Sequence, residues 1–181
     1  PMGETVVHVH DEILNQGYAE TSLMLLYHCN LGYPVVAEGA RLITPPAEVI
    51  PRDDAARELF DERGDFLSPT DGFAERVYDH RITGLDTPAS ASVVNPGYEP
   101  TGGIAVTVTW DPSQLPRMWQ WRMQGPGTYV CGLEPGNCGL AGRAAERAAG
   151  DVESLTPGEK REFDLSIRIS LGADAAALAA T

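Results

Sequence analysis

A stretch near the end of the chain, residues 162–171 (EFDLSIRISL), alternates strictly between polar and apolar residues. Because successive side chains of a β-strand point to opposite faces, this period of two predicts a strand with one buried face. It is the clearest periodic signal in the sequence. Stacked antiparallel sheets are the natural architecture for such a strand, because its apolar face needs a second layer to cover it.

Several other segments also have strand character. The predicted strands, besides 162–171, are 5–14, 21–29, 40–44, 75–82, 104–110, 118–123 and 128–134. Residues 118–123 and 128–134 flank Gly125-Pro126-Gly127 and are expected to form a hairpin. The segment 21–29 is apolar on both faces, which predicts a central, covered strand. The 19 glycines and 14 prolines cluster between these stretches, as is typical of all-β proteins. We therefore predict an all-β fold, an antiparallel β-sandwich.

The remaining segments are expected to be loops. Residues 45–72 are polar and acidic and predict a long loop, either functional or mobile, with one or two helical turns around 53–62. Residues 83–103 are also expected to be loop, and the alanine-rich tail from Ala173 is expected to be either a helical turn or a frayed end. A length of 181 residues suits one domain spanning residues 1–181.

The charge balance excludes some classes of partner. The chain has 13 Lys and Arg against 26 Asp and Glu, a formal net charge of −13. Such a surface repels phosphate backbones and anionic lipids, so neither nucleic acid nor a membrane is expected as a partner. No apolar run approaches the ~18 residues that span a bilayer, and no basic-then-apolar leader opens the chain. We expect a soluble, cytoplasmic protein.

The cysteine and histidine spacings do not make a complete metal site. Cys29, Cys131 and Cys138 lack zinc-binding spacing and are expected to be buried free thiols. His8 and His10 would point to one face of a strand and could chelate a transition metal, as in cupin barrels. A cupin needs a Glu four or five positions later, where this chain has Leu14 and Asn15. No metal and no cofactor are expected, although a surface metal site at these histidines stays open.

Two titratable residues are candidates for chemistry. Glu134 shares a strand face with Gly132 and precedes Pro135-Gly136-Asn137, so it sits where a strand enters a loop. The glycine removes a side chain on that face and leaves room for a ligand. His28 shares a face of its predicted strand with Leu26. The structural alternative is a solvated strand-end Glu and a core His.

Three motifs resemble segments of one known family, in the same order. They are YHCNLGYP (27–34), the pair Asp79-His80 in RVYDHRI (76–82), and GLEPGNC (132–138). They resemble the aldose 1-epimerases, which are the galactose mutarotase-like proteins, and look like an uncharacterised bacterial branch of that family. The resemblance covers roughly residues 5–171 and implies a β-supersandwich fold. It also implies interconversion of the α and β anomers of a free sugar.

The resemblance assigns roles to individual residues. His28 matches the general acid that protonates the ring oxygen, and Glu134 matches the base that takes the proton of the anomeric hydroxyl. Asp79 matches a residue that binds a sugar hydroxyl. Asn30 matches the Asn of the family's Asn-Leu pair but comes two residues sooner after the His. Opening a hemiacetal needs such an acid and base, each contributing roughly 10²–10⁴-fold.

Further sugar-binding candidates are weaker. Trp119 and Trp121 would face the same way on a strand, with Arg122 on the opposite face; packing into the core is the commoner fate of such a tryptophan pair. Trp121 and Arg122 are favoured because they fall inside a family-like stretch. Arg41 and Asn137 are candidates of the same kind.

The match covers only part of the family's length. This chain resembles the C-terminal half, and no counterpart is visible for an Arg and a second His from the N-terminal half that bind the sugar. The chain is therefore a fragment, a protein completed by a partner chain, or a reduced binding module. If the segment from Thr5 is an interior strand, the isolated chain exposes an unpaired edge, which predicts a homo-oligomer or a partner chain that supplies the missing strands.

We therefore expect a protein that binds a monosaccharide or sugar derivative and acts as an aldose 1-epimerase. Two alternatives stay open. One is a non-catalytic carbohydrate-binding module. The other is a lyase or isomerase acting on an oxidised sugar, because fold alone does not fix function.

Overall fold

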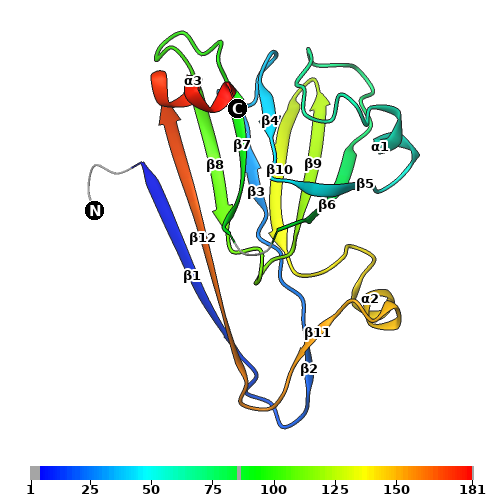
Figure 1. Ribbon diagram of the computed structural model, residues 1–181. Helices are drawn as coiled ribbons and strands as arrows, with labels where there is room; N and C mark the ends of the chain where they lie inside the picture. The colour runs from blue at the N-terminus through cyan, green and yellow to red at the C-terminus, as the bar shows by residue number, and fades with distance from the viewer. Residues whose placement is uncertain (1–4, 85–86, 181) are drawn as a thin grey trace.

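The computed structural model describes residues 5–84 and 87–180, which form two antiparallel sheets of five strands with an apolar core between them (Figure 1). The first sheet contains β1 (Val6–Leu14), β12 (Lys160–Leu171), β8 (Ile104–Trp110), β7 (Ala89–Asn95) and β4 (Arg41–Ile43), in that order. The second contains β3 (Cys29–Leu31), β10 (Thr128–Gly136), β9 (Arg117–Gly125), β6 (Arg76–Ile82) and β5 (Ala47–Pro51). The predicted antiparallel β-sandwich is confirmed.

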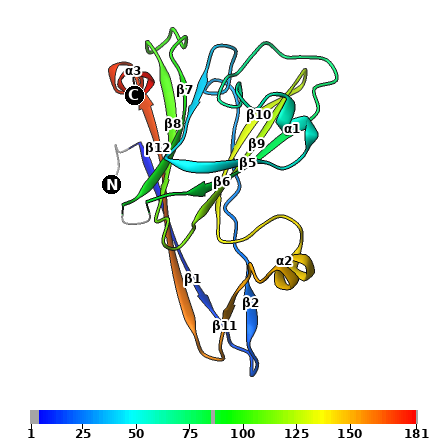
Figure 2. The ribbon, with the colours of Figure 1, turned by 45° about the vertical axis from the view of Figure 1, so that its right-hand side comes forward.

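A small third sheet and three short helices complete the described structure. The small sheet pairs β2 (Thr21–Leu23) with β11 (Glu153–Leu155), and the helices are α1 (Asp54–Glu58), α2 (Arg143–Ala149) and α3 (Ala173–Ala179). Figure 2 shows β1 and β12 extending beyond the other long strands toward this small sheet. None of the helices in the described ranges has the length and apolarity needed to cross a bilayer.

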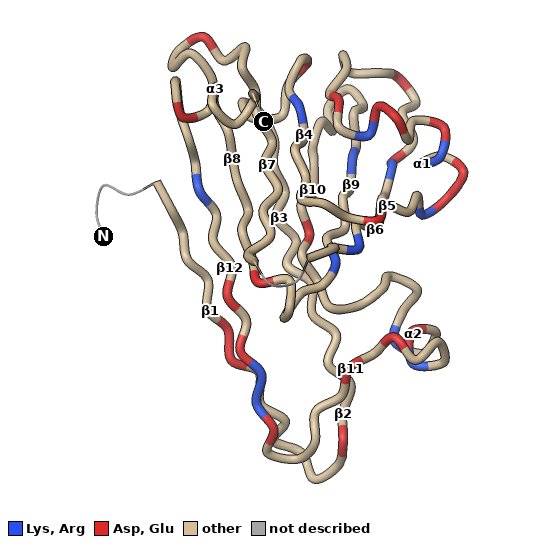
Figure 3. The backbone as a smooth tube through the Cα atoms, in the orientation of Figure 1, with Lys and Arg blue, Asp and Glu red and all other residues tan. Residues whose placement is uncertain are grey.

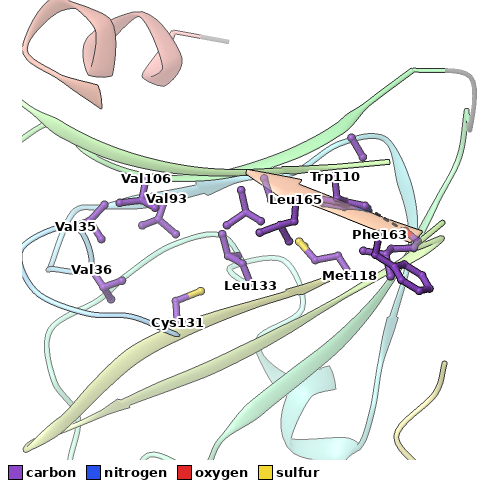
Figure 4. Packing of buried hydrophobic residues seen from close by; sticks show 14 of the residues in the cluster. Val35, Val36, Val93, Val106, Trp110, Met118, Cys131, Leu133, Phe163 and Leu165 are labelled. Atoms are coloured by element: carbon purple, nitrogen blue, oxygen red, sulfur yellow. Dashed lines mark hydrogen bonds between the residues drawn. The ribbon is translucent and has the colours of Figure 1, made fainter. Parts of the chain in front are cut away.

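The strand with strict alternation lies inside the first sheet, as predicted. On β12, Leu165 is flanked by Val9 of β1 and Trp110 of β8, and both Leu165 and Trp110 are buried. Figure 4 shows these side chains facing Met118 and Leu133 of the second sheet. The far end of the strand leaves the core, where Leu171 is 44% exposed.

The predicted strand 21–29 is wrong, because the segment divides between two sheets. β2 ends at Leu23 and β3 begins at Cys29, with a bridge between Leu26 and Gly136 in the gap. The side-chain amide of Asn137 fixes the backbone between β2 and β3. Its Oδ1 accepts from Leu25 N at 2.8 Å, and its Nδ2 donates to Leu23 O at 3.2 Å. The segment is apolar because Leu25 and Tyr27 pack against the core while the chain runs beside the end of β10, where Tyr27 N donates to Pro135 O at 2.9 Å.

Two predicted loops contain regular structure. Residues 83–103 include β7, whose buried residues are mainly small, so the apolar alternation is hard to see. Residues 45–72 include the edge strand β5 and helix α1, whose N-cap Asp53 accepts from Ala56 N at 2.9 Å. The helical turn expected there is confirmed, and the tail from Ala173 forms a helical turn rather than a frayed end.

The rest of the acidic segment is fastened to the second sheet through its own backbone carbonyls. Arg122 donates to the carbonyls of Glu62 and Asp65, and Tyr78 donates from its hydroxyl to Leu59 O. Gln120 binds the carbonyl of Arg63 in the same way. Figure 3 shows acidic residues gathered in this segment around α1. The sheet therefore holds this acidic loop mainly through backbone carbonyls, together with a contact between Arg76 Nη2 of β6 and Glu58 Oε2 at 3.4 Å.

Candidate active site

His28 and Glu134 meet at the edge of the second sheet. β3 pairs antiparallel with β10, with Asn30 opposite Gly132 and Cys29 opposite Leu133. Continuing this register by one residue places His28 opposite Glu134. His28 Nε2 lies 3.0 Å from Glu134 Oε1; the histidine side chain is 50% exposed and the glutamate side chain 5% exposed. A buried carboxylate therefore faces an imidazole that solvent and ligand can reach.

Burial shapes the chemistry of Glu134. Desolvation raises the pKa of this carboxyl above the ordinary glutamate value, and the charge of His28 opposes that rise. Within the described residues Oε1 accepts no hydrogen bond, so the contact with His28 is an ion-pair contact without hydrogen-bond alignment. A carboxylate left without a full set of partners is available to accept a proton from a ligand.

The pair opens into a cavity of about 410 Å³. Its lining residues are Leu26, His28, Asn30, Arg52, Glu75, Val77, Trp121, Glu134 and Leu140. The ring of Trp121 meets that of His28 edge-on, with centroids 6.0 Å apart and planes at 69°. An aromatic and aliphatic wall with a few polar groups is typical of a small-molecule site.

The structure brings four of the predicted site residues together: His28, Glu134, Asn30 and Trp121 all line this cavity. Asp79 lies on the same face of the sheet but farther along it. Trp119 is opposite Glu134 on one side and opposite Asp79 on the other, so the indole separates the two carboxylates. Asp79 Oδ2 accepts from Arg81 Nε at 3.1 Å, and Asp79 Oδ1 is buried without a partner among the described residues.

The other three candidates lie away from the cavity. Arg122 points to the opposite face of β9 and holds the acidic segment, as described above. Asn137 is buried, and its side chain is hydrogen-bonded to the backbone between β2 and β3. Arg41 lies on β4 in the first sheet, where its backbone forms an isolated antiparallel β-bridge with that of Asp65.

Besides the apolar residues Leu26 and Val77, three lining residues were missed by the sequence reasoning. Arg52 follows β5 inside the predicted loop, Leu140 lies in the loop after β10, and Glu75 directly precedes β6. None belongs to a motif, and their spacing carries no signal. Only the pairing of β5 with β6 brings Arg52 beside Glu75.

The histidines of β1 lie at a different place. His10 Nδ1 is 2.8 Å from Asp164 Oδ1, and with His8 it lines a second cavity of about 530 Å³ beside β12. In residues 5–84 and 87–180, no group of three or more His, Cys, Asp or Glu side chains is placed to hold a metal ion. Cys131 and Cys138 are buried free thiols, as expected, and Cys29 is half-buried.

Solved structures of mutarotase-like proteins share this fold. A "putative aldose 1-epimerase" from Klebsiella pneumoniae superposes with a TM-score of 0.87 at 28% identity, covering 98% of this chain and 46% of that protein. A galactose mutarotase-like protein from Clostridium acetobutylicum gives a TM-score of 0.59 at 14% identity, covering 91% of this chain and 52% of that one. A galactose mutarotase related enzyme from Lactobacillus acidophilus gives 0.62 at 14% identity, covering 94% and 59%.

The chain thus spans about half the length of these solved structures. No curated protein matches it. A protein-family model described as "Domain of unknown function (DUF4432)" matches residues 1–169. Because that match covers most of the chain, the protein belongs to the DUF4432 family.

Proposed function

We propose that this protein binds a free aldose in the cavity beside His28 and Glu134 and interconverts its α and β anomers. The observation that carries the proposal is the buried carboxylate 3.0 Å from a half-exposed imidazole, at the wall of a cavity large enough for a monosaccharide. The mutarotase-like fold, shared with a 28% identical structure, supports it.

The proposed acid–base step takes the roles of the two groups from the family resemblance and is supported by their closeness, 3.0 Å. Ionised Glu134 removes the proton of the anomeric hydroxyl, the bond between the anomeric carbon and the ring oxygen breaks, and protonated His28 gives its proton to that oxygen. The aldehyde of the open sugar rotates about the bond between its carbonyl carbon and the neighbouring carbon. The ring then closes with the roles reversed, so that His28 accepts a proton and Glu134 donates one. Burial makes Glu134 a stronger base than an exposed glutamate, because its pKa is raised toward neutrality.

A non-catalytic sugar-binding module is the second candidate. It is favoured by one observation, namely that the chain spans only 46% of the length of the Klebsiella structure. If the remaining half of the sugar contacts came from another chain, this chain alone could bind sugar without turning it over.

A lyase or isomerase acting on an oxidised sugar fits the charges less well. An anionic sugar needs a cation that is free to pair with it. The described cationic side chains lining the cavity are Arg52 and His28, and each already faces a carboxylate. The cavity is better matched to a neutral sugar.

Anomer exchange tests the function directly. Freshly dissolved pure anomers of several aldoses would be followed by polarimetry or by NMR magnetisation exchange, with and without the protein. Faster equilibration that saturates with sugar concentration supports the epimerase. Sugar binding in calorimetry without faster equilibration supports the binding module, and ultraviolet absorbance from an unsaturated product supports a lyase.

We also propose that the chain pairs with a second chain, either a copy of itself or a different one. β1 pairs only with β12 within the described residues, so one edge of the first sheet is open. Val7 on this strand is 60% exposed and Leu14 is 47% exposed. An open edge with apolar side chains favours strand pairing between chains.

A further inference from the structure

Arg52, Glu75 and the indole N–H of Trp121 form a hydrogen-bonded wall of the cavity on the side away from His28 and Glu134. We refer to Arg52 and Glu75 as the wall. Arg52 Nη2 donates to Glu75 Oε1 at 2.8 Å, and Trp121 Nε1 donates to Glu75 Oε2 at 3.0 Å. Each oxygen of Glu75 therefore holds one partner. These hydrogen bonds, first that of Arg52 and then that of Trp121, lower the pKa of Glu75, so the carboxylate is charged at neutral pH.

The wall is held from behind by the start of α1. Arg52 Nε donates to Asp53 Oδ2 at 2.8 Å, while the other oxygen of Asp53 caps the helix at Ala56 N. The backbone of Arg52 is also fixed, because its N–H donates to Val77 O at 2.9 Å. Hydrogen bonds therefore hold the guanidinium of Arg52 and the carboxylate of Glu75 in place, while their side chains remain 37% and 48% exposed and open to a ligand.

The wall and the acid–base pair are separated by the width of a small ring-shaped ligand. Trp121 on β9 is opposite Gly132 on β10 and opposite Val77 on β6. Neighbouring strands lie ≈ 4.8 Å apart, so the strand of Glu134 and the strand that follows Glu75 are roughly 10 Å apart. A sugar with its anomeric carbon beside His28 would lie along Trp121 and reach the wall with its opposite side.

We propose that Arg52 and Glu75 form a specificity fork that binds two neighbouring hydroxyls on the side of the sugar away from the anomeric carbon. The carboxylate accepts from one hydroxyl and the guanidinium donates to the other, which together match a vicinal diol. Glu75 is in addition a positioning residue for Trp121, since it fixes the indole beside the ring. This inference rests on the proposed function and names the substrate class: neutral pyranoses with a diol distant from the anomeric carbon.

The first test uses the wild-type protein and deoxy sugars. Removing a distal ring hydroxyl should raise KM about tenfold or more and leave kcat within about twofold, because the lost contact is made equally in ground and transition states. A sugar lacking the hydroxyl next to the anomeric carbon is the matched control and should keep its KM. Equal KM values for all these sugars would overturn the fork.

The second test uses Glu75→Gln and Arg52→Met. Both should raise KM and the calorimetric Kd about tenfold or more, and both should no longer discriminate between the parent sugar and its distal deoxy analogue. Glu48→Gln, at the exposed position of β5, and Arg57→Met on α1 are matched controls and should behave as wild type. Unchanged KM in Glu75→Gln, or discrimination that persists in it, would overturn the proposal.

The proposed epimerase activity and the proposed fork of Arg52 and Glu75 can each be overturned separately. If wild-type protein binds sugars but does not exchange their anomers, the epimerase is overturned and the fork is judged by calorimetric Kd alone. If exchange depends on Glu134 but not on Glu75 or Arg52, the fork is overturned and the epimerase stands. If no monosaccharide of the panel binds, both are overturned.

Discussion

The carboxylate of Glu134 lies over Gly132, in the space that any side chain at residue 132 would fill. A Cβ there would collide with Oε1 of Glu134 and come 3.3 Å from the Cβ of Trp121. The glycine therefore lets the buried carboxylate turn toward His28, rather than simply leaving room for a ligand. The geometry of the proposed acid–base pair therefore depends on a residue that has no side chain of its own.

Gly132→Ala should consequently disturb the pair. The added methyl group displaces the carboxylate from the neighbourhood of His28, and anomer exchange should fall at least about tenfold, which corresponds to about 1.4 kcal/mol in the barrier. Exchange rate and melting temperature would be measured on the same protein. Gly125→Ala is the matched control in the same sheet, since its nearest neighbour would be a flexible methionine methyl at 3.6 Å. Wild-type exchange in Gly132→Ala would contradict this account.

Removing either partner of the pair should abolish most of the exchange. Glu134→Gln keeps the shape of the side chain but cannot accept the proton, so exchange should fall by roughly 10²-fold or more while sugar binding changes little. His28→Asn should cause a comparable loss. The double variant should be little worse than either single one, because the acid and base act as a unit.

The same variants separate catalysis from structure. If the two residues only stabilise the fold, His28→Asn would lower the melting temperature and Glu134→Gln would leave exchange unchanged. Melting temperature and exchange rate measured on the three proteins distinguish these outcomes. Wild-type exchange in Glu134→Gln would end the epimerase proposal and favour the sugar-binding module.

The pH dependence of exchange should report the raised pKa of Glu134. The base must be ionised, so kcat/KM should fall toward acid with an apparent pKa above the ordinary glutamate value. The free energy of unfolding should depend on pH in the opposite direction and decrease as the pH rises. Because the folded-state pKa is raised, the stability linked to Glu134 is fully present below its unfolded pKa and is lost as the pH rises through the folded value. Glu134→Gln should remove that loss, as measured by urea unfolding across pH.

His80 should make the fold sensitive to acid. Burial lowers the pKa of this histidine to about 4, although its hydrogen bond with Gln120 opposes the shift. Between pH 6.5 and 4 the unfolded chain binds a proton that the folded chain does not. As the pH is lowered through this window, the free energy of unfolding should therefore decrease by up to about 1.4 kcal/mol per pH unit.

Replacing His80 should remove this contribution. In His80→Gln the free energy of unfolding should depend less on pH between 6.5 and 4, although the variant is expected to be less stable at pH 7. His8→Gln, on the exposed part of β1, is the control and should keep the wild-type pH dependence. An unchanged slope in His80→Gln would contradict the assignment.

The open edge of the first sheet should produce self-association or a stable complex with another chain. Sedimentation across micromolar concentrations should show a dimer or larger species, or a co-purifying partner. Val7→Lys places a charge on the exposed edge strand and should weaken the association. A stable monomer at every concentration, with no partner, would count against the assembly.

The strands with strong alternation were the predictable part of the fold. β12 and β8 lie where the sequence indicated, because each has a regular contrast between its two faces, and the β9–β10 hairpin lies where the turn Gly125-Pro126-Gly127 indicated it. β7 was missed because alanine and serine provide little contrast in size or polarity. The segment 21–29 was misread because a run apolar on both faces is typical both of a central strand and of an irregular segment whose side chains pack against the core from its edge.

The candidate site was predictable only where a motif carried it. His28, Asn30 and Glu134 belong to family-like segments, and the structure brings them to one cavity. Arg122 and Asn137 belong to the same stretches, yet their side chains bind backbone groups in the interior. A motif indicates which residues recur together but not which face of a strand each one occupies.

Local sequence thus determined the strands, their alternation and the presence of an imidazole and a carboxylate in recognisable segments, because these depend on residues near each other in the chain. Only the tertiary structure decided that Glu134 is buried against His28, and that Arg52 and Glu75 form the opposite wall. Those relationships arise from the pairing of β3 with β10 and of β5 with β6. Strand register joins residues that are distant in the sequence, so no local pattern encodes it.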